Sequence, residues 1–302
     1  MAEAAATSGN NNDDEQPILS PAFHPLAIGN PGDKPPSHED IVAVINILKD
    51  AGICCCFVDE VALNYYGAKR VRNDYVLCVP DEQHEQATKC FASHNTIFEP
   101  VGPSPVKGVH SLHHLYPRFK AIGRTDFLLI LPASYCHIDC KPENIEWGQW
   151  GKSASLPYPK LNVYAQSMID TRNGVDLSDL IDGMDLSEEW GEESLDLEGD
   201  CDLQWAQKRV EALRAAAPTP EQRATFLDPK PFPRREFWQE RASIGSKRRR
   251  LGWKYSPEIY ATRFRRHGSK DPRLRGMKKD LAAKAECTQQ ECQQDGGDLG
   301  NC

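Results

Sequence analysis

The spacing of hydrophobic residues predicts that the first half of the chain alternates between helices and strands. Apolar residues recur at helical spacing after Ser37 and stop at Gly52, which predicts a helix over residues 37–52. The next run, 53–58, is short, continuously apolar and bounded by a glycine and by acids, as is typical of a buried strand. A second strand is predicted over 73–79, where Val, Tyr and Cys are frequent and a proline ends the run.

The same criteria predict the remaining elements. Further helical patterns cover 61–66, 81–94, 163–169, 177–186 and 205–217. Further strands or extended stretches are expected at 96–101, 118–123, 127–131 and 157–159. This order predicts an α/β (α+β) fold, in which a mixed sheet flanked by helices is followed by an irregular, mostly helical C-terminal lobe.

Composition sets the expected domain limits. Residues 1–36 are rich in Ala, Asn, Asp, Pro and Gly and lack an apolar period, so we expect a disordered N-terminal segment. A sheet-containing domain is expected over 37–145 and a C-terminal lobe over 146–275. The polar, Gln- and Gly-rich stretch 276–302 is expected to be a disordered tail.

Charge is strongly segregated within the C-terminal lobe. The net charge is -8, but acids dominate residues 170–202 and basic residues dominate 230–275. The two segments could neutralise each other within one fold, or they could bind a partner. In the second case, a nucleotide or single-stranded nucleic acid would be bound by cations beside an aromatic ring, namely Lys247, Arg248, Arg249, Arg250 and Trp253.

The sequence contains no apolar run long enough to cross a membrane, and its start lacks the basic and apolar regions of a secretion signal. We therefore expect no membrane association and a cytoplasmic location, with nuclear import possible through the basic cluster.

Eleven cysteines are present, three of them contiguous as Cys54, Cys55 and Cys56. We expect them to be small buried hydrophobic residues in a reducing compartment, because no two cysteine pairs have the spacing of a zinc site.

The unit from residue 54 to residue 80 carries the candidate chemistry, in the letters CCCFVDEVALNYYGAKRVRNDYVLCVP. It resembles the minimal nucleotidyltransferase domain of the toxin and aminoglycoside nucleotidyltransferase type. In that family, an apolar strand ends in Gly-Gly or Gly-Ser, a short helix follows, and a basic turn leads into D-x-[DE] on the next strand. The resemblance implies that residues 37–145 form a nucleotidyltransferase-like domain that places nucleotide phosphates at a helix N-terminus and Mg²⁺ on strand carboxylates.

Carried over residue by residue, the resemblance implies catalytic roles for Asp74 and Asp126. It places Asp59, Glu60 and Arg70 around the nucleotide, and makes Asp74 and Asp59 the candidate metal ligands. Without the resemblance, Asp59 and Glu60 would be ordinary helix N-terminal acids, and Asp74 a strand acid paired with Arg70 or Arg72.

Two departures from the family pattern put the reaction in doubt. Asp59-Glu60 stands where the family has Gly-Gly or Gly-Ser, so negative charge lies where phosphate would bind. Val76 stands where the family has its second metal carboxylate. We therefore expect an impaired nucleotidyltransferase-like protein, a pseudoenzyme that acts by binding and needs no cofactor. The alternatives are an active enzyme that uses Asp74 with Asp59 or Asp126 and Mg²⁺, and a protein that binds nucleic acid through its basic segment.

Two further sequence similarities are weaker guides to function. Over most of residues 20–275 the chain resembles a group of filamentous-fungal proteins, most clearly in DLIDGMDLSEEWGEESLDL and LGWKYSPEIYATRFRRHGSKDPRLR, and this implies a fold but no reaction. Residues 137–144, HIDCKPEN, resemble the catalytic loop of protein kinases. The Gly-rich loop and the DFG motif of kinases have no counterpart in the sequence, so a polar turn is the favoured interpretation.

Overall fold

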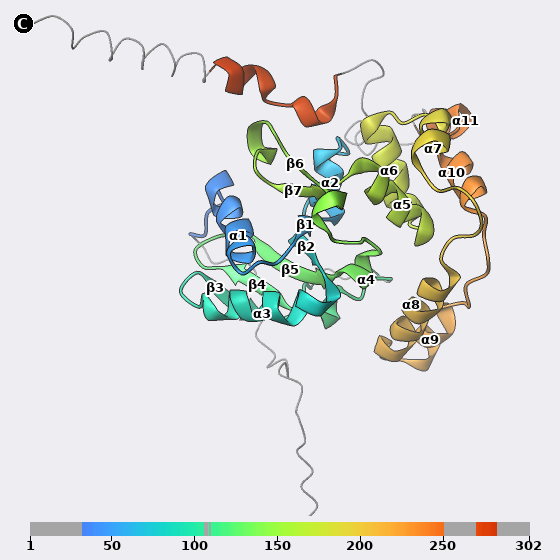
Figure 1. Ribbon diagram of the computed structural model, residues 1–302. Coiled ribbons are helices and arrows are strands. Elements are labelled where there is room, and N and C mark those ends of the chain that lie inside the picture. The colour runs from blue at the N-terminus through green and yellow to red at the C-terminus, as the bar shows by residue number, and fades with distance from the viewer. Residues whose placement is uncertain (1–31, 106–107, 109, 251–269, 283–302) are drawn as a thin grey trace, which may run out of the picture.

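The computed structural model describes residues 32–105, 108, 110–250 and 270–282, and contains a mixed sheet flanked by helices, as predicted (Figure 1). The sheet strands are β1 (Cys56–Phe57), β2 (Tyr75–Val79), β3 (Phe98–Val101), β4 (Arg118–Ala121) and β5 (Phe127–Pro132). Their order across the sheet is β1-β2-β5-β4-β3. Only β2 and β5 run parallel, and the other neighbours are antiparallel.

The central strands are β2 and β5, and their burial explains their composition. All five residues of β2 and the first five of β5 are buried, so both strands are continuously apolar rather than alternating. Strand β4 differs because it carries two buried cations on one side, Arg118 and Lys120. Each has an acidic partner: Arg118 pairs with Asp74, and Lys120 with Asp33 at 2.9 Å.

The helices of the sheet-containing half are α1 (His38–Asp50), α2 (Asp59–Tyr65), α3 (His84–Ser93) and the short α4 (Ala133–Cys136). Helix α1 begins at a capping box, in which Ser37 Oγ accepts from the Asp40 amide and the Asp40 carboxylate accepts from the Ser37 amide. Its apolar stripe is buried, as the helical spacing predicted. Short 3₁₀ turns lie at Asp81–Gln83, His113–Leu115, Pro142–Asn144, Gly151–Ser153 and Pro272–Leu274.

The C-terminal lobe is mostly helical, as expected. Its helices are α5 (Leu161–Asp170), α6 (Gly174–Met184), α7 (Glu188–Ser194), α8 (Leu203–Ala216), α9 (Pro220–Thr225), α10 (Arg234–Ala242) and α11 (Ile244–Arg250). A two-stranded sheet of β6 (Ile145–Trp147) and β7 (Pro157–Pro159) precedes them. Helices α5, α6, α7 and α10 pack together, and α8 with α9 forms a separate hairpin (Figure 1).

Helices α2 and α6 join the two halves through a close backbone contact at two glycines. A Cβ atom on Gly67 would lie 2.5 Å from the Gly183 carbonyl oxygen, and one on Gly183 would lie 2.6 Å from the Tyr66 carbonyl oxygen. Gly67 also has φ of 100°, which strongly favours glycine. The contact therefore depends on the absence of side chains at both positions.

Basic and acidic segments of the C-terminal lobe pair with each other. Arg250 holds both oxygens of Asp182 at 2.7 and 2.8 Å, and Lys247 lies 3.4 Å from Asp185. Arg234 similarly pairs with Asp170 at 2.7 Å. These contacts favour mutual neutralisation over the partner-binding alternative for part of the basic segment; Trp253 lies outside the described residues.

The described ends of the chain extend beyond the expected domain limits. Residues 32–36 were assigned to a disordered segment, yet the buried carboxylate of Asp33 pairs with Lys120 on β4. Asp280, assigned to the tail, accepts a hydrogen bond from the Gly151 amide at 2.7 Å. The rest of both expected disordered segments lies outside the described residues.

No helix in the described part of the chain is both long enough and apolar enough to cross a membrane.

Candidate functional site

A cleft of about 910 Å³ lies between the sheet-containing half and the C-terminal helices. The N-terminus of α2 forms one wall, and α5, the α5–α6 turn and α8 form others. Of the residues predicted to be functional, Asp59, Glu60 and Arg70 line this cleft. Asp74 and Asp126 are not among its lining residues.

Asp59 has the backbone conformation that glycine favours. Its φ is 51°, at the first residue of α2, where the nucleotidyltransferase family has glycine. Aspartate is one of the few other residues that tolerate this left-handed region. Its carbonyl oxygen also accepts a hydrogen bond from the Tyr164 hydroxyl at 3.1 Å. Asp59 therefore combines a turn conformation that glycine favours with a carboxylate-bearing side chain at the cleft.

The two acids at this turn have strongly raised pKa values. Burial, and then the charge of Asp176, raises the pKa of Asp59 to about 7. Burial, and then the charge of Asp59, raises the pKa of Glu60 to about 7. His113 Nε2 lies 3.5 Å from the Asp59 carboxylate, and burial lowers the pKa of this histidine. The acids therefore carry only part of their full negative charge near neutral pH.

The cleft arginines differ in how far their charge is already neutralised. Arg70 pairs with Asp176 at 2.8 Å and also with Asp179, so two carboxylates balance its charge. Arg209, on α8, lies 4.8 Å from the ring centroid of Tyr135 and 5.1 Å from that of Trp205. It also donates to a backbone carbonyl of the facing loop at 2.8 Å. Arg209 is therefore a cation held by aromatic rings on the cleft wall.

Asp74 is held by a buried arginine rather than by either predicted partner. Arg118 Nε and Nη2 each donate to one oxygen of Asp74, both at 2.9 Å, and both residues are 6% exposed. The guanidinium also stacks on Phe127, 3.7 Å from the ring centroid. The predicted pairing of Asp74 with Arg70 or Arg72 was therefore wrong. Arg118 on β4, which is separated from β2 by β5 in the sheet, reaches the Asp74 carboxylate instead.

Asp126 also has a cationic partner within the chain. Arg72 pairs with one of its oxygens, and the Thr125 hydroxyl donates to the other at 2.9 Å. Across the described ranges, no three histidine, aspartate or glutamate side chains gather closely enough to share a metal ion. Asp59, Asp74 and Asp126 therefore do not form a three-carboxylate metal site.

The kinase-like loop is a turn held by contacts within residues 137–144 and by one contact with Asp202. His137 has φ of 53° and its Nε2 lies 3.0 Å from the Asp202 carboxylate. Asp139 pairs with Lys141 at 2.9 Å, and the Asn144 amide donates to the Asp139 carbonyl. These contacts support the interpretation as a polar turn.

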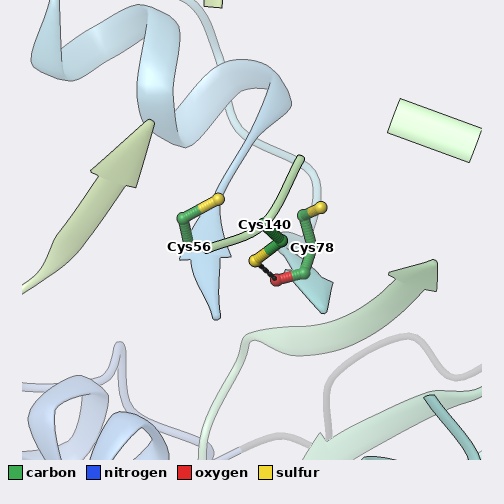
Figure 2. A group of neighbouring side chains, drawn as sticks. All are labelled: Cys56, Cys78 and Cys140. Atoms are coloured by element: carbon green, nitrogen blue, oxygen red, sulfur yellow. Dashed lines mark hydrogen bonds between the residues drawn. The ribbon is translucent and has the colours of Figure 1, made fainter. Parts of the chain in front are cut away.

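The same loop contributes to a group of thiols that the sequence did not predict. Cys56, Cys78 and Cys140 are buried, and their Sγ atoms all lie within 4.8 Å of one another (Figure 2). Hydrogen bonding from the Cys56 and Cys78 thiols lowers the pKa of Cys140 below that of an ordinary thiol. The available signal was the placement of Cys56 and Cys78 on consecutive predicted strands, which made cross-strand pairing possible. The third member could not be found from spacing.

Comparison with protein-family models and with curated proteins found no match.

Proposed function

We propose that this protein is a nucleotidyltransferase-like protein that acts by binding a nucleotide in the 910 Å³ cleft, without metal-assisted transfer. The single observation that carries the proposal is the bidentate pair between Arg118 and Asp74. A carboxylate that receives two charge-assisted hydrogen bonds from a buried guanidinium is a poor ligand for Mg²⁺, because metal binding would have to displace the arginine.

The residue two positions after Asp74 supports the same conclusion. Val76 is a buried apolar residue of β2 and offers no ligand atom. Magnesium that bridges phosphates is usually held by one or two protein carboxylates as well as by the substrate. With Asp74 paired and Val76 apolar, neither of these two positions offers a carboxylate free of a protein cation.

Binding without transfer fits the chemistry of the cleft walls. Arg209 supplies a cation for phosphate, and the Tyr135 and Trp205 rings supply flat apolar surfaces for a base. The pKa values of about 7 at Asp59 and Glu60 reduce their repulsion of phosphate, and a protonated carboxyl can donate a hydrogen bond to a phosphate oxygen.

Nucleic-acid binding through the basic segment is the weaker candidate. Lys247 and Arg250 already pair with Asp185 and Asp182. Arg248 and Arg249 are exposed. Of the described residues in this basic cluster, these two would therefore have to make most of the contacts with phosphate. A gel shift that weakens steeply as salt is added would favour this candidate.

Isothermal titration of the full chain with ATP, in Mg²⁺ and then in EDTA, tests the proposal. We expect similar dissociation constants in both conditions and no transfer of labelled nucleotide. Arg209→Gln should weaken binding about tenfold, equivalent to about 1.4 kcal/mol. Arg214→Gln is the matched control, because Arg214 lies on the same helix and pairs instead with Asp228.

Two results would contradict the proposal. Tight binding that requires Mg²⁺, together with nucleotide transfer that Asp74→Ala abolishes, would establish the active alternative. The absence of ATP binding in either condition would remove a nucleotide as the ligand of this cleft.

A further inference from the structure

We propose that Cys56, Cys78 and Cys140 bind a structural zinc ion, with a fourth thiolate from Cys54 or Cys136. This site does not depend on the proposed function, because Cys56, Cys78 and Cys140 are not among the residues that line the cleft. It consists of thiols that the proposed binding function does not use.

The positions of the three sulfurs follow from the topology of the sheet. Cys56 and Cys78 are directly opposite each other on the antiparallel strands β1 and β2, so both side chains lie on one face. Cys140 comes from the loop after α4, and its thiol donates to the Cys78 carbonyl at 3.5 Å, as Figure 2 shows. Three separate segments of the chain thus place their thiols next to one another in the protein interior.

The spacing of the sulfurs is close to that of a thiolate metal centre. Zinc–sulfur bonds of about 2.3 Å in a tetrahedral site place neighbouring sulfurs about 3.8 Å apart. The three Sγ atoms lie within 4.8 Å of one another. Contraction by about 1 Å is within reach of small side-chain rotations.

Two further thiols border this group and can complete it. Cys140 Sγ lies 3.8 Å from the Cys54 carbonyl oxygen, and Cys136 ends α4, four residues before Cys140. Both are partly buried. A closed site with four thiolates and no water is the usual arrangement of structural zinc, and soft sulfur ligands select zinc over magnesium or calcium.

Zinc at this point would fix one wall of the cleft. Strand β1 is only two residues long and leads directly into Val58 and Asp59, which line the cleft. Cys136 and Ile138, on the other side of the thiol group, also line it. A metal ion would therefore hold the start of α2 and the end of α4 against β2, independently of any ligand in the cleft.

Metal analysis of the full chain, purified under reducing conditions without chelator, tests the proposal. We expect about one zinc ion per chain, released by a thiol-modifying reagent. Each of Cys56→Ser, Cys78→Ser and Cys140→Ser should lower the zinc content at least about tenfold. The Cys54→Ser and Cys136→Ser variants identify the fourth ligand, because only the variant that lacks it should lose zinc. Retention of zinc in both variants would overturn the four-thiolate site.

Two controls and a second measurement keep the result interpretable. Cys55→Ser changes a buried thiol that lies outside the group, and Cys90→Ser a partly buried one; both variants should retain zinc. If the ligand variants do not fold, the wild-type chain still decides. Replacement of zinc by Co²⁺ should then give the absorption bands of tetrahedral thiolate coordination.

Three results for the wild-type chain would overturn the proposal. The first is no zinc bound even when zinc is offered in excess. The second is copper bound in place of zinc. The third is an intact mass lighter by two hydrogens under the same reducing conditions, which would show a disulfide between two of the thiols.

Discussion

Replacing Arg118 by methionine tests whether Asp74 is a structural carboxylate. The change removes both hydrogen bonds at 2.9 Å and leaves Asp74, which is 6% exposed, buried without its cation. Breaking one side of a buried ion pair costs about 3–5 kcal/mol of unfolding free energy, because the remaining charge is neither solvated nor paired. Methionine retains apolar contact with Phe127, so most of this loss reports the charge.

A double-mutant cycle measured by urea unfolding separates the effect of losing the Asp74–Arg118 ion pair from a nonspecific loss of stability. Asp74→Asn with Arg118→Met removes both charges, so we expect the double variant to be at least about 2 kcal/mol more stable than Arg118→Met alone. Arg72→Met is the control: its pair with Asp126 is more exposed and should contribute at most about 1 kcal/mol. Equal stability of Arg118→Met and the double variant would refute the reasoning, and would leave Asp74 available for metal.

Two further predictions concern the interface between the halves and the acids of the cleft. Gly183→Ala should destabilise the chain by about 1–2 kcal/mol in urea unfolding, because its Cβ would meet the Tyr66 carbonyl at 2.6 Å and overpacking outweighs the gain in helix propensity. Gly245→Ala is the control and should be neutral or stabilising, because no atom lies within 4 Å of the added Cβ. A Gly183→Ala variant as stable as the wild type would contradict the close contact. The pKa values of Asp59 and Glu60 are about 7 in the folded protein and about 4 in the unfolded chain. The contribution of these two acids to the free energy of unfolding is therefore full below about pH 4 and is lost as the pH rises through 7. Asp59→Asn with Glu60→Gln should therefore flatten the decline in unfolding free energy between pH 4 and 8, and an unchanged slope would show that these acids are not the cause.

The local elements of the sheet-containing half could be predicted because their signals are local. The capping residues and apolar spacing of α1 and the continuous apolar run of β2 determine their own conformations. Helices α4, α7, α9, α10 and α11 were not predicted. They are short, and α10 is stabilised by packing against α5, α6 and α7 rather than by an apolar period of its own.

The candidate site was predictable only in part, for the same reason. The resemblance to the nucleotidyltransferase pattern pointed to a set of candidate residues, namely Asp59, Glu60, Arg70, Asp74 and Asp126. It did not show that Arg118, 44 residues from Asp74, would take both oxygens of that carboxylate. That pairing depends on β4 lying beside β5 in the sheet, and the strand order is a tertiary property.

The sequence by itself determined the succession of helices and strands, the segregation of charge, and the two departures from the nucleotidyltransferase pattern. The tertiary structure decided which side chains meet: Asp74 with Arg118, the acidic segment with the basic one, and Cys56 and Cys78 with Cys140. Backbone propensity and capping act over a few residues, so they can be found along the chain. Charge pairing and sulfur clustering act through space, so they exist only once distant segments have packed together.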